Sequence, residues 1–404
     1  MEPLAEVALL ELGIVIVSLA VVAGIARYIN ESDIPFFIVV GILLGPYGIG
    51  RFCSFYVGNT PTADLFIELG AELGVMFLLF FMGLSFSVKK LIKHRNKISL
   101  VGTIDLLNFA PGILIGYFFF RDLIAAFLIG GVVYISSSAV ISKSLLDLGW
   151  DSTPEAEQML ERLVFEDLVI VIYLSVMSTV IIGEGANLVT IAKNVGFAML
   201  FVIALILVVY LKPEYFDKVL DTDSDELFIL RAVGIIAAVS GAAVVLGISE
   251  AVAAFFIGIA FGGSEHLAKL QRYLFPFRYL FAGIFFFWIG METDPLLFGS
   301  IWQLLILTVI ATTVYKFFTA YYGAKFYELD SQSSTRVGIA MITRGEFSLV
   351  IAALAAQAVG PYATPVITKQ IPAFAVSYVL VMSILGTVLL QHMSKKVKEL
   401  PRKI

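Results

Sequence analysis

The chain of 404 residues is 59% hydrophobic and only 15% charged, with a mean hydropathy of +0.95. Soluble domains carry about 25% charged residues, so this composition excludes a water-soluble fold and indicates a membrane protein. The net charge of -5 argues against a nucleic-acid partner, because surfaces that bind nucleic acid are basic. The single cysteine, Cys53, excludes an internal disulfide and a multi-thiolate metal site.

Thirteen hydrophobic segments are long enough to be membrane-spanning helices. Each span needs about 20 apolar residues, so the length leaves no room for a soluble catalytic domain. We therefore expect an all-α, polytopic membrane protein. The predicted spans are residues 8–26, 33–49, 64–86, 98–119, 122–147, 156–183, 188–211, 228–245, 247–263, 275–299, 301–323, 336–359 and 371–392.

Basic residues are distributed unequally between the two sides of these spans. The loops after odd-numbered spans, together with the C-terminal tail, contain 18 Lys and Arg residues, and the loops on the opposite side contain four. Cytoplasmic loops are enriched in Lys and Arg. We expect a multi-pass protein of the plasma membrane, with its N-terminus outside and its C-terminus in the cytoplasm.

An odd number of spans between two halves predicts an inverted repeat. If spans 1–6 and 8–13 form two units joined by span 7, the second unit enters the membrane from the opposite side, as in many secondary transporters. Polar runs at 134–138 in span 5 and 343–348 in span 12 predict two interrupted helices. Non-helical backbone persists at membrane depth only where protein or a water-filled cavity surrounds it, so we expect the two breaks to cross near the midplane.

Span 6 contains two adjacent carboxylates, Glu166 and Asp167, within an otherwise apolar helix. A charge at this depth costs about 2.5 to 3.5 kcal/mol, so intramembrane acids are functional by default. Carboxylate oxygens suit small cations, and protons compete for the same oxygens. The pair predicts a site for a transported cation, and a purely structural ion pair is the alternative.

Lys316 lies in the middle of span 11, too far from either end to reach the membrane surface. We expect it to pair with Glu166 and to release that carboxylate, or to lose a proton, when a cation arrives. A structural pair is an equally good interpretation. Asp105 and Arg162 are further charges in or near the spans, with no partner assigned from the sequence.

Four residues at the predicted breaks carry charge or hydroxyl groups. Arg344 and Glu346 flank Gly345, where they are expected to neutralise half-helix ends and exposed carbonyls. Ser137 and Ser138 either contribute oxygens to a bound cation or satisfy the broken helix itself.

Two further acids, Glu68 and Glu72, lie one turn apart in the outer half of span 3. They predict an entry funnel for cations, and an interfacial position is an equally good interpretation.

The order and spacing of these motifs resemble the monovalent cation:proton antiporter-2 family, which includes NapA-type sodium/proton antiporters and Kef-type potassium-efflux proteins. Each motif alone is weak, and their combination over nearly the whole length is specific. The matching stretches are 41–46, 71–75, 78–80, 83–84, the Ser136–Ser138 break, Glu166-Asp167, 285–291 with Asp294, and 344–348.

The resemblance implies a homodimer with a mobile ion-carrying core and an elevator movement. Residues 1–97 (spans 1–3) and 228–299 (spans 8–10) would form the dimerisation and scaffold domain. The core would comprise 98–183 (spans 4–6) and 300–392 (spans 11–13). Residues 184–227 would provide the linker span with a cytoplasmic loop, and 393–404 a basic cytoplasmic tail.

The resemblance also assigns roles to individual residues. Asp167 matches the family's ion- and proton-binding aspartate, and Lys316 matches the lysine opposite it. Ser137 or Ser138 falls where hydroxyl residues line the crossover. Glu166 occupies a position that is Asp in the NapA-type proteins and Gln in the Kef-type, so this residue leaves the stoichiometry open.

We therefore expect a transporter, and not an enzyme, that exchanges a monovalent cation for H+ across the lipid bilayer. Na+ is favoured, with K+ or Li+ as alternatives, and Asp167 and Glu166 bind the cargo. No cofactor is expected, because the sequence has no phosphate loop, nucleophile elbow or zinc-type spacing. The alternatives are a K+/H+ efflux antiporter regulated by a separate soluble subunit, a cation channel or uniporter, an intramembrane hydrolase that uses Asp167 with Asp105, and a non-transporting sensor.

Overall fold

The computed structural model describes residues 2–29, 33–85, 95–138, 140–141, 145, 150, 153–182, 196, 218–245 and 250–397. Within these ranges the regular structure is entirely helical, which confirms the all-α prediction. Nine of the described helices are long and apolar enough to cross a membrane, and shorter apolar helices cover 123–134, 253–262 and 346–356. Apart from residue 196, the seventh expected span, 188–211, lies outside the described residues, so the count of thirteen stays a prediction.

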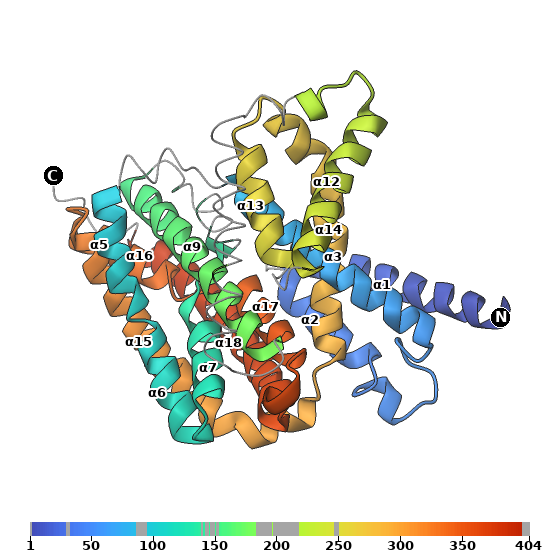
Figure 1. The fold of residues 1–404 in the computed structure, drawn as a ribbon. Coiled ribbons are helices and arrows are strands. Elements are labelled where there is room, and N and C mark those ends of the chain that lie inside the picture. Colours follow the sequence, from blue (N-terminus) through green and yellow to red (C-terminus); the bar gives the residue numbers. More distant parts are fainter. Residues whose placement is uncertain are drawn as a thin grey trace.

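The helices form two groups that lie side by side in Figure 1. In the first group α3 packs against α13 and α14, and α14 also packs against α2. This group comprises α1 (Glu2–Tyr28), α2 (Asp33–Leu44), α3 (Pro61–Ser85), α12 (Asp225–Val245), α13 (Glu250–Gly262) and α14 (Leu267–Met291).

Glycines allow the helix backbones of this first group to come very close together. A Cβ atom on Gly83 of α3 would lie 2.0 Å from the carbonyl oxygen of Phe255, and one on Gly258 of α13 would lie 2.1 Å from that of Phe80. Small residues at helix contacts are the usual basis of tight packing in membranes. The α3–α13 contact therefore depends on both glycines.

The second group contains the remaining long helices. Here α6 packs against α7, α15 against α16, and α17 against α18. Its members are α5 (Arg95–Leu106), α6 (Phe109–Phe120), α7 (Leu123–Tyr134), α9 (Pro154–Ile182), α15 (Phe298–Lys325), α16 (Ser331–Ala340), α17 (Glu346–Ala356) and α18 (Ile371–Val397). Short 3₁₀ turns at Ile49–Arg51, Pro295–Leu297 and Gly360–Tyr362 and a π-helical turn at Val366–Gln370 complete the described structure.

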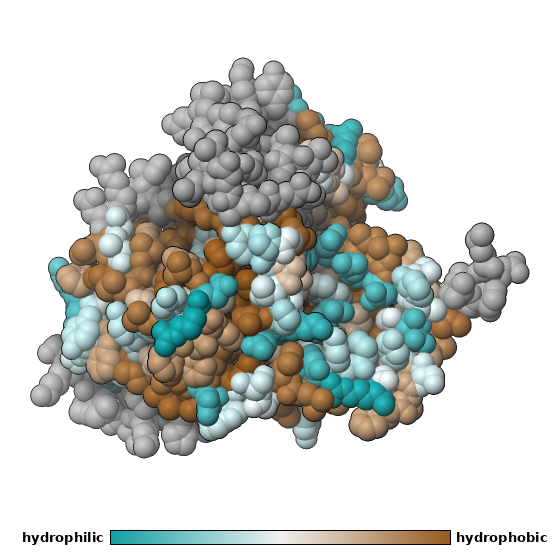
Figure 2. Space-filling model, turned by 60° about the horizontal axis from the view of Figure 1, so that its bottom comes forward, coloured by the Kyte–Doolittle hydropathy of each residue, from teal (hydrophilic) through white to brown (hydrophobic). Residues whose placement is uncertain are grey.

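Large apolar side chains cover much of the outer surface. Figure 2 shows hydrophobic residues over a large part of one face, with hydrophilic residues between them. Leu9 on α1 is 72% exposed, Leu114 on α6 is 70% exposed, and Ile310 on α15 is 59% exposed. In water such surfaces would aggregate, whereas lipid tails solvate them, so the surface agrees with a multi-pass membrane protein.

The predicted fourth span is divided into α5 and α6 by a short turn at residues 107–108. Pro111 has no N–H to donate to the carbonyl of Leu107, and its ring crowds that carbonyl. Asn108 stabilises the turn, because its side-chain amide donates to the main-chain oxygen of Asp105 over 2.8 Å. The turn places Asp105 in the last helical turn of α5, inside the second group.

The two predicted interruptions are present, and they cross. Helix α7 ends at Tyr134 and continues as non-helical backbone through Ser137. Helix α16 ends at Ala340, and α17 begins at Glu346 after a second non-helical segment. The amide N–H of Ser137 donates to the carbonyl oxygen of Thr343 over 3.1 Å, which joins the two breaks directly. This arrangement confirms the predicted inverted-repeat fold with two crossed broken helices.

The crossing is close because residue 345 is glycine. A Cβ atom there would lie 2.3 Å from Ser137 Oγ and 2.7 Å from Ser137 Cβ. We predict that Gly345→Ala separates the two breaks and destabilises the fold by about 1 to 3 kcal/mol, as overpacking does in other cores. The midpoint of thermal unfolding in detergent measures this effect.

Gly299→Ala is the matched control, because a Cβ atom on Gly299 meets nothing within 4 Å. We expect it to keep the unfolding midpoint of the unmodified protein. Equal midpoints for both variants would contradict the close crossing.

Candidate functional site

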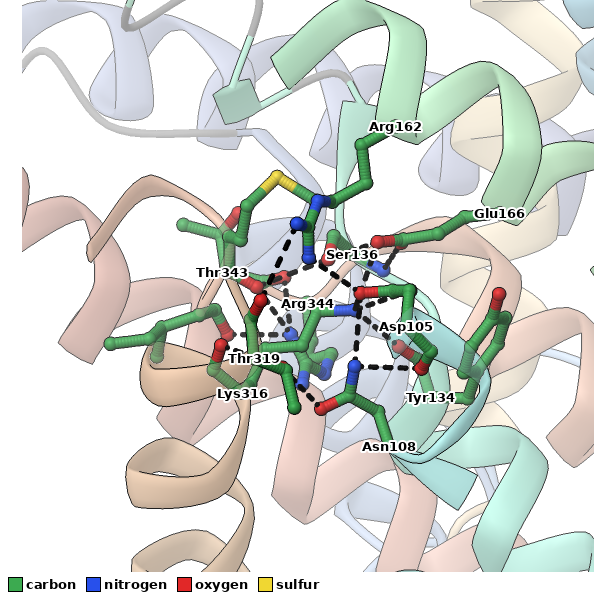
Figure 3. Close-up of polar contacts among 12 residues, drawn as sticks. Asp105, Asn108, Tyr134, Ser136, Arg162, Glu166, Lys316, Thr319, Thr343 and Arg344 are labelled. Carbon is green, nitrogen blue, oxygen red and sulfur yellow. Dashed lines mark hydrogen bonds and ion pairs between the residues drawn. The ribbon is translucent and has the colours of Figure 1, made fainter. Parts of the chain in front are cut away.

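Buried charged side chains gather where the two broken helices cross (Figure 3). They come from four different elements of the second group. They are Asp105 on α5, Arg162, Glu166 and Asp167 on α9, Lys316 on α15, and Arg344 and Glu346 at the break before α17.

Lys316 is at the centre of this cluster. Its Nζ atom lies 2.8 Å from Glu166 Oε1 and 3.2 Å from Asp105 Oδ2, and it also donates to the main-chain oxygen of Tyr134 over 3.0 Å. Its side chain is only 1% exposed. The Lys316–Glu166 contact is the pairing expected from the sequence, and the role of this pair in transport stays a prediction.

Glu166 is fully engaged by hydrogen bonds. Oε2 accepts from the amide N–H of Ser136 over 2.7 Å, and Oε1 accepts from Lys316 and, more weakly, from the Ser136 hydroxyl at 3.3 Å. Ser136 is part of the non-helical segment after α7 and offers its amide because no helical partner uses it. The broken helix and Lys316 together hold this carboxylate in place.

Asp167 is the next residue, and its surroundings are different. It is 8% exposed, and its Oδ1 atom is buried with no hydrogen-bond partner among the described residues. The nearby acidic groups that act on it electrostatically are Glu166 and Glu346. A buried carboxylate oxygen without a donor requires an explanation, and a proton or a cation would satisfy it.

Arg344 neutralises the carbonyl ends of the interrupted helices. Its Nε donates to the oxygen of Val133 over 3.0 Å, and its Nη1 donates to the oxygens of Met341, Ile342 and Thr343 over 2.8 to 3.0 Å. The C-terminal end of a helix carries partial negative charge, so a buried guanidinium is stabilised there. This is the structural arrangement expected for Arg344.

Glu346 lies at the N-terminal end of a helix, whereas Arg344 faces C-terminal carbonyls. It is the first residue of α17, where the helix dipole is positive, and its carboxylate accepts from the hydroxyls of Ser137 and Ser138 over 3.3 and 3.2 Å. Both serine hydroxyls therefore face Glu346 in this structure. Their expected role as cation ligands stays a prediction.

The sequence left Asp105 and Arg162 without partners, and the structure brings them into the cluster. Arg162 Nη1 lies 2.8 Å from Asp105 Oδ1, and both side chains are completely buried. The sequence did contain one indication that Arg162 belongs to the cluster. Arg162 precedes Glu166 by four residues, so the two side chains share a face of the helix. Nothing in the sequence indicated that α5 would supply the counter-ion.

The predicted entry funnel lies on a different group of helices. Glu68 and Glu72 are on the exposed face of α3, and they belong to none of the contacts described above. Their role as a funnel stays a prediction.

Crossed helix breaks that surround buried, paired charges, with one carboxylate oxygen unbonded among the described residues, are typical of a secondary ion transporter. Residues 14–396 match the transmembrane sodium/hydrogen exchanger family, and the chain belongs to this family. It is therefore a cation/proton antiporter and not an enzyme. The family also confirms the resemblance to the monovalent cation:proton antiporter-2 proteins.

Curated relatives match along most of their length. The chain is 34% identical to the K(+)/H(+) antiporter subunit KhtU of Bacillus subtilis, covering 98% of this chain and 95% of the relative. It is 28% identical to the ammonium/H(+) antiporter subunit AmhT of Alkalihalophilus pseudofirmus, covering 94% and 91%. It is 27% identical to the probable Na(+)/H(+) antiporter GerT of Bacillus cereus, covering 85% and 89%.

The fold is also similar to a solved structure. The sodium proton antiporter MjNhaP1 of Methanocaldococcus jannaschii superposes with a TM-score of 0.74 over 98% of this chain and 100% of that one, at 14% sequence identity. At this identity the similarity establishes the fold alone.

The contacts of Arg344 lead to a test of the site's structure. We predict that Arg344→Met lowers the unfolding free energy by about 3 kcal/mol or more, because buried carbonyls lose their donors. The unfolding free energy of Arg344→Lys should lie between those of Arg344→Met and the unmodified protein, because an ammonium keeps the charge but lacks the planar, multiply donating guanidinium. Thermal unfolding in detergent gives the order.

Arg272→Met serves as the control, because Arg272 is exposed on α14. An Arg344→Met protein as stable as this control would show that the carbonyl contacts are not needed.

Proposed function

We propose that the protein exchanges one monovalent cation for H+ at Asp167. The observation that carries this proposal is the contrast between two neighbouring carboxylates. Glu166 is fixed by Lys316 and Ser136, whereas Oδ1 of Asp167 is buried without a partner in the part of the chain that the structure describes. Asp167 Oδ1 is therefore an oxygen that can accept a cation or a proton without first breaking a hydrogen bond to another described residue.

The coupling rule follows from the cost of moving charge through lipid. A bare carboxylate is expensive at membrane depth, so the site crosses only when a cation or a proton has neutralised it. Both ions use the same oxygens, so they take turns. Exchange then occurs without a leak of either ion.

The available driving forces are sufficient for such exchange. A tenfold proton gradient supplies about 1.4 kcal/mol per proton. A potential of 100 mV supplies about 2.3 kcal/mol for each net charge that crosses. The proton gradient moves a monovalent cation against a gradient of the same order, and the potential contributes only where net charge crosses in each cycle.

We propose an elevator movement of the second helix group against the first. Residues 98–183 and 300–392 would form the mobile core, and 1–97 and 228–299 would form the scaffold and the homodimer interface. The location of the buried charges supports this division, since Asp105, Asp167 and Lys316 all belong to the second group. The glycine contacts between α3 and α13 support a rigid scaffold. The proposed orientation in the plasma membrane remains N-terminus outside and C-terminus in the cytoplasm.

For the cargo we propose K+, in place of the Na+ that the sequence favours. The relative at 34% identity is named a K(+)/H(+) antiporter subunit, and the one at 28% is named for ammonium, an ion of similar size to K+. Both names contain the word subunit, which supports a second component, and we propose a soluble regulatory one. A single free carboxylate also suits a weakly hydrated ion, because it compensates less dehydration energy than two carboxylates would.

Asp167→Asn tests the proposed function. An amide takes no part in proton exchange and provides one weaker oxygen, so we predict loss of exchange by at least a hundredfold. The measurement is cation-driven proton movement in proteoliposomes, read with an internal pH dye. Full exchange by this variant would refute the assignment.

The matched control is Asp122→Asn. Asp122 caps α7 by accepting from the amide of Ala125, and asparagine caps a helix about as well as aspartate does. We expect this variant to exchange at the unmodified rate.

The cargo is tested in everted vesicles with K+, NH4+, Na+ and Li+ compared across pH. We predict the lowest half-saturating concentration for K+ or NH4+, rising as the pH falls because protons compete for Asp167. A lowest value for Na+ or Li+ would restore the cargo expected from the sequence. Cation uptake without proton counterflow would indicate a uniporter.

A further inference from the structure

Asp105 is a buried carboxylate that the proposed exchange at Asp167 does not use. Its side chain is fully buried in the last turn of α5. Oδ1 accepts from Arg162 over 2.8 Å and from the amide of Asn108 over 2.9 Å, and Lys316 donates to both oxygens over 3.2 to 3.3 Å. Lys316 therefore has two carboxylate partners, Asp105 and Glu166, at the same time (Figure 3).

The position of Asp105 is held from several sides. Asn108 bonds both the main-chain oxygen and the side chain of Asp105, and the hydroxyl of Thr319 on α15 donates to Asn108 Oδ1 over 2.9 Å. The break between α5 and α6 that Pro111 imposes allows Asn108 to make these bonds. The Asp105 carboxylate is therefore held in place. Any adjustment of the Lys316–Asp105 contact during exchange must come from movement of the Lys316 side chain.

These contacts give a balanced set of four charges. Asp105 and Glu166 contribute two negative charges, and Arg162 and Lys316 contribute two positive charges. All four side chains are at most 1% exposed. Buried charges persist where they are paired and hydrogen-bonded, so the formal sum of zero is a constraint on the site.

We propose that Asp105 is a positioning residue for exchange, which keeps Lys316 charged throughout the cycle by serving as its second counter-ion. When a cation at Asp167 attracts the neighbouring Glu166 carboxylate and weakens its pairing with Lys316, the ammonium stays paired with Asp105 and keeps its proton. Asp167 then remains the single group that alternates between cation and proton. This inference rests on the proposed function of Asp167, and it adds a stoichiometry of one cation for one proton with no net charge moved.

The charge balance gives the consequence of removing Asp105. With asparagine there, Arg162, Lys316 and Glu166 sum to +1, and Lys316 loses the partner that kept it charged. Cation binding then releases the proton of Lys316 as well as that of Asp167. The variant exchanges two protons for one cation and moves one net charge in each cycle.

Proteoliposomes containing the full chain test this difference. An internal pH dye and a potential-sensitive dye report proton movement and charge movement after a K+ jump. For the unmodified protein we expect a pH change without a potential, and for Asp105→Asn a slower pH change with a potential. A tetraphenylphosphonium gradient of about 60 mV should shift the steady-state K+ ratio about tenfold in this variant and leave the unmodified protein unchanged.

Two further variants separate charge from structure. Asp105→Glu keeps the negative charge, so it should exchange K+ for H+ without generating a membrane potential. The double variant Asp105→Asn with Arg162→Gln removes one charge of each sign, so it should fold even if Asp105→Asn alone does not. It should still generate a potential, because Lys316 has no second counter-ion in it either.

Three results would overturn the inference. They are a potential generated by the unmodified protein, exchange without a potential by Asp105→Asn, and exchange without a potential by the double variant. Two other results would contradict the proposed function itself. They are an absence of proton movement by the unmodified protein and full cation/proton exchange by Asp167→Asn.

Discussion

The balance of charge inside the membrane is the constraint on which the rest of this structure depends. Seven charged side chains from α5, α9 and α15 and from the crossover meet at a depth where no bulk water screens them. Each of them would be costly alone, and their pairing makes the arrangement stable. The pairing also singles out Asp167, because the neighbouring carboxylate of Glu166 is hydrogen-bonded and Asp167 Oδ1 has no partner among the described residues. In the proposed mechanism, the capacity for exchange arises from this difference between the two neighbouring carboxylates.

The crossed helix breaks add partial charges of the backbone to the full charges of these side chains. Interrupted helices expose carbonyls at one end and amides at the other, and each end carries partial charge of one sign. Arg344 faces the carbonyl ends, and Glu346 lies at the start of α17. The freed amide of Ser136 binds Glu166, so the same break that requires compensation also supplies a ligand for the site. Fold and function therefore depend on the same few residues.

Sequence reasoning found the breaks and the Lys316–Glu166 pair for a simple physical reason. Polar runs and charges in apolar spans have few acceptable solutions, and opposite charges at equal depth must meet. The residue pattern alone does not show which carboxylate oxygens are left without a donor, although the family resemblance assigns ion and proton binding to Asp167. Adjacent residues point about 100° apart around a helix, so the answer depends on how α9 is rotated against its neighbours. The contact of Asp105 with Lys316 joins helices 211 residues apart, and the serine–Glu346 contacts join the two repeats. Such contacts follow from tertiary packing, which the sequence pattern does not specify.

Binding of K+ to the purified protein, with counting of the protons it releases, tests the central claim most directly. Titration calorimetry in buffers of different ionisation enthalpy measures that number. If one carboxylate serves both ions, K+ binding releases up to one proton per ion, the number falls towards zero as the pH rises, and Asp167→Asn releases none. Tight K+ binding that releases no proton at any pH where exchange occurs would show that the two ions use separate groups.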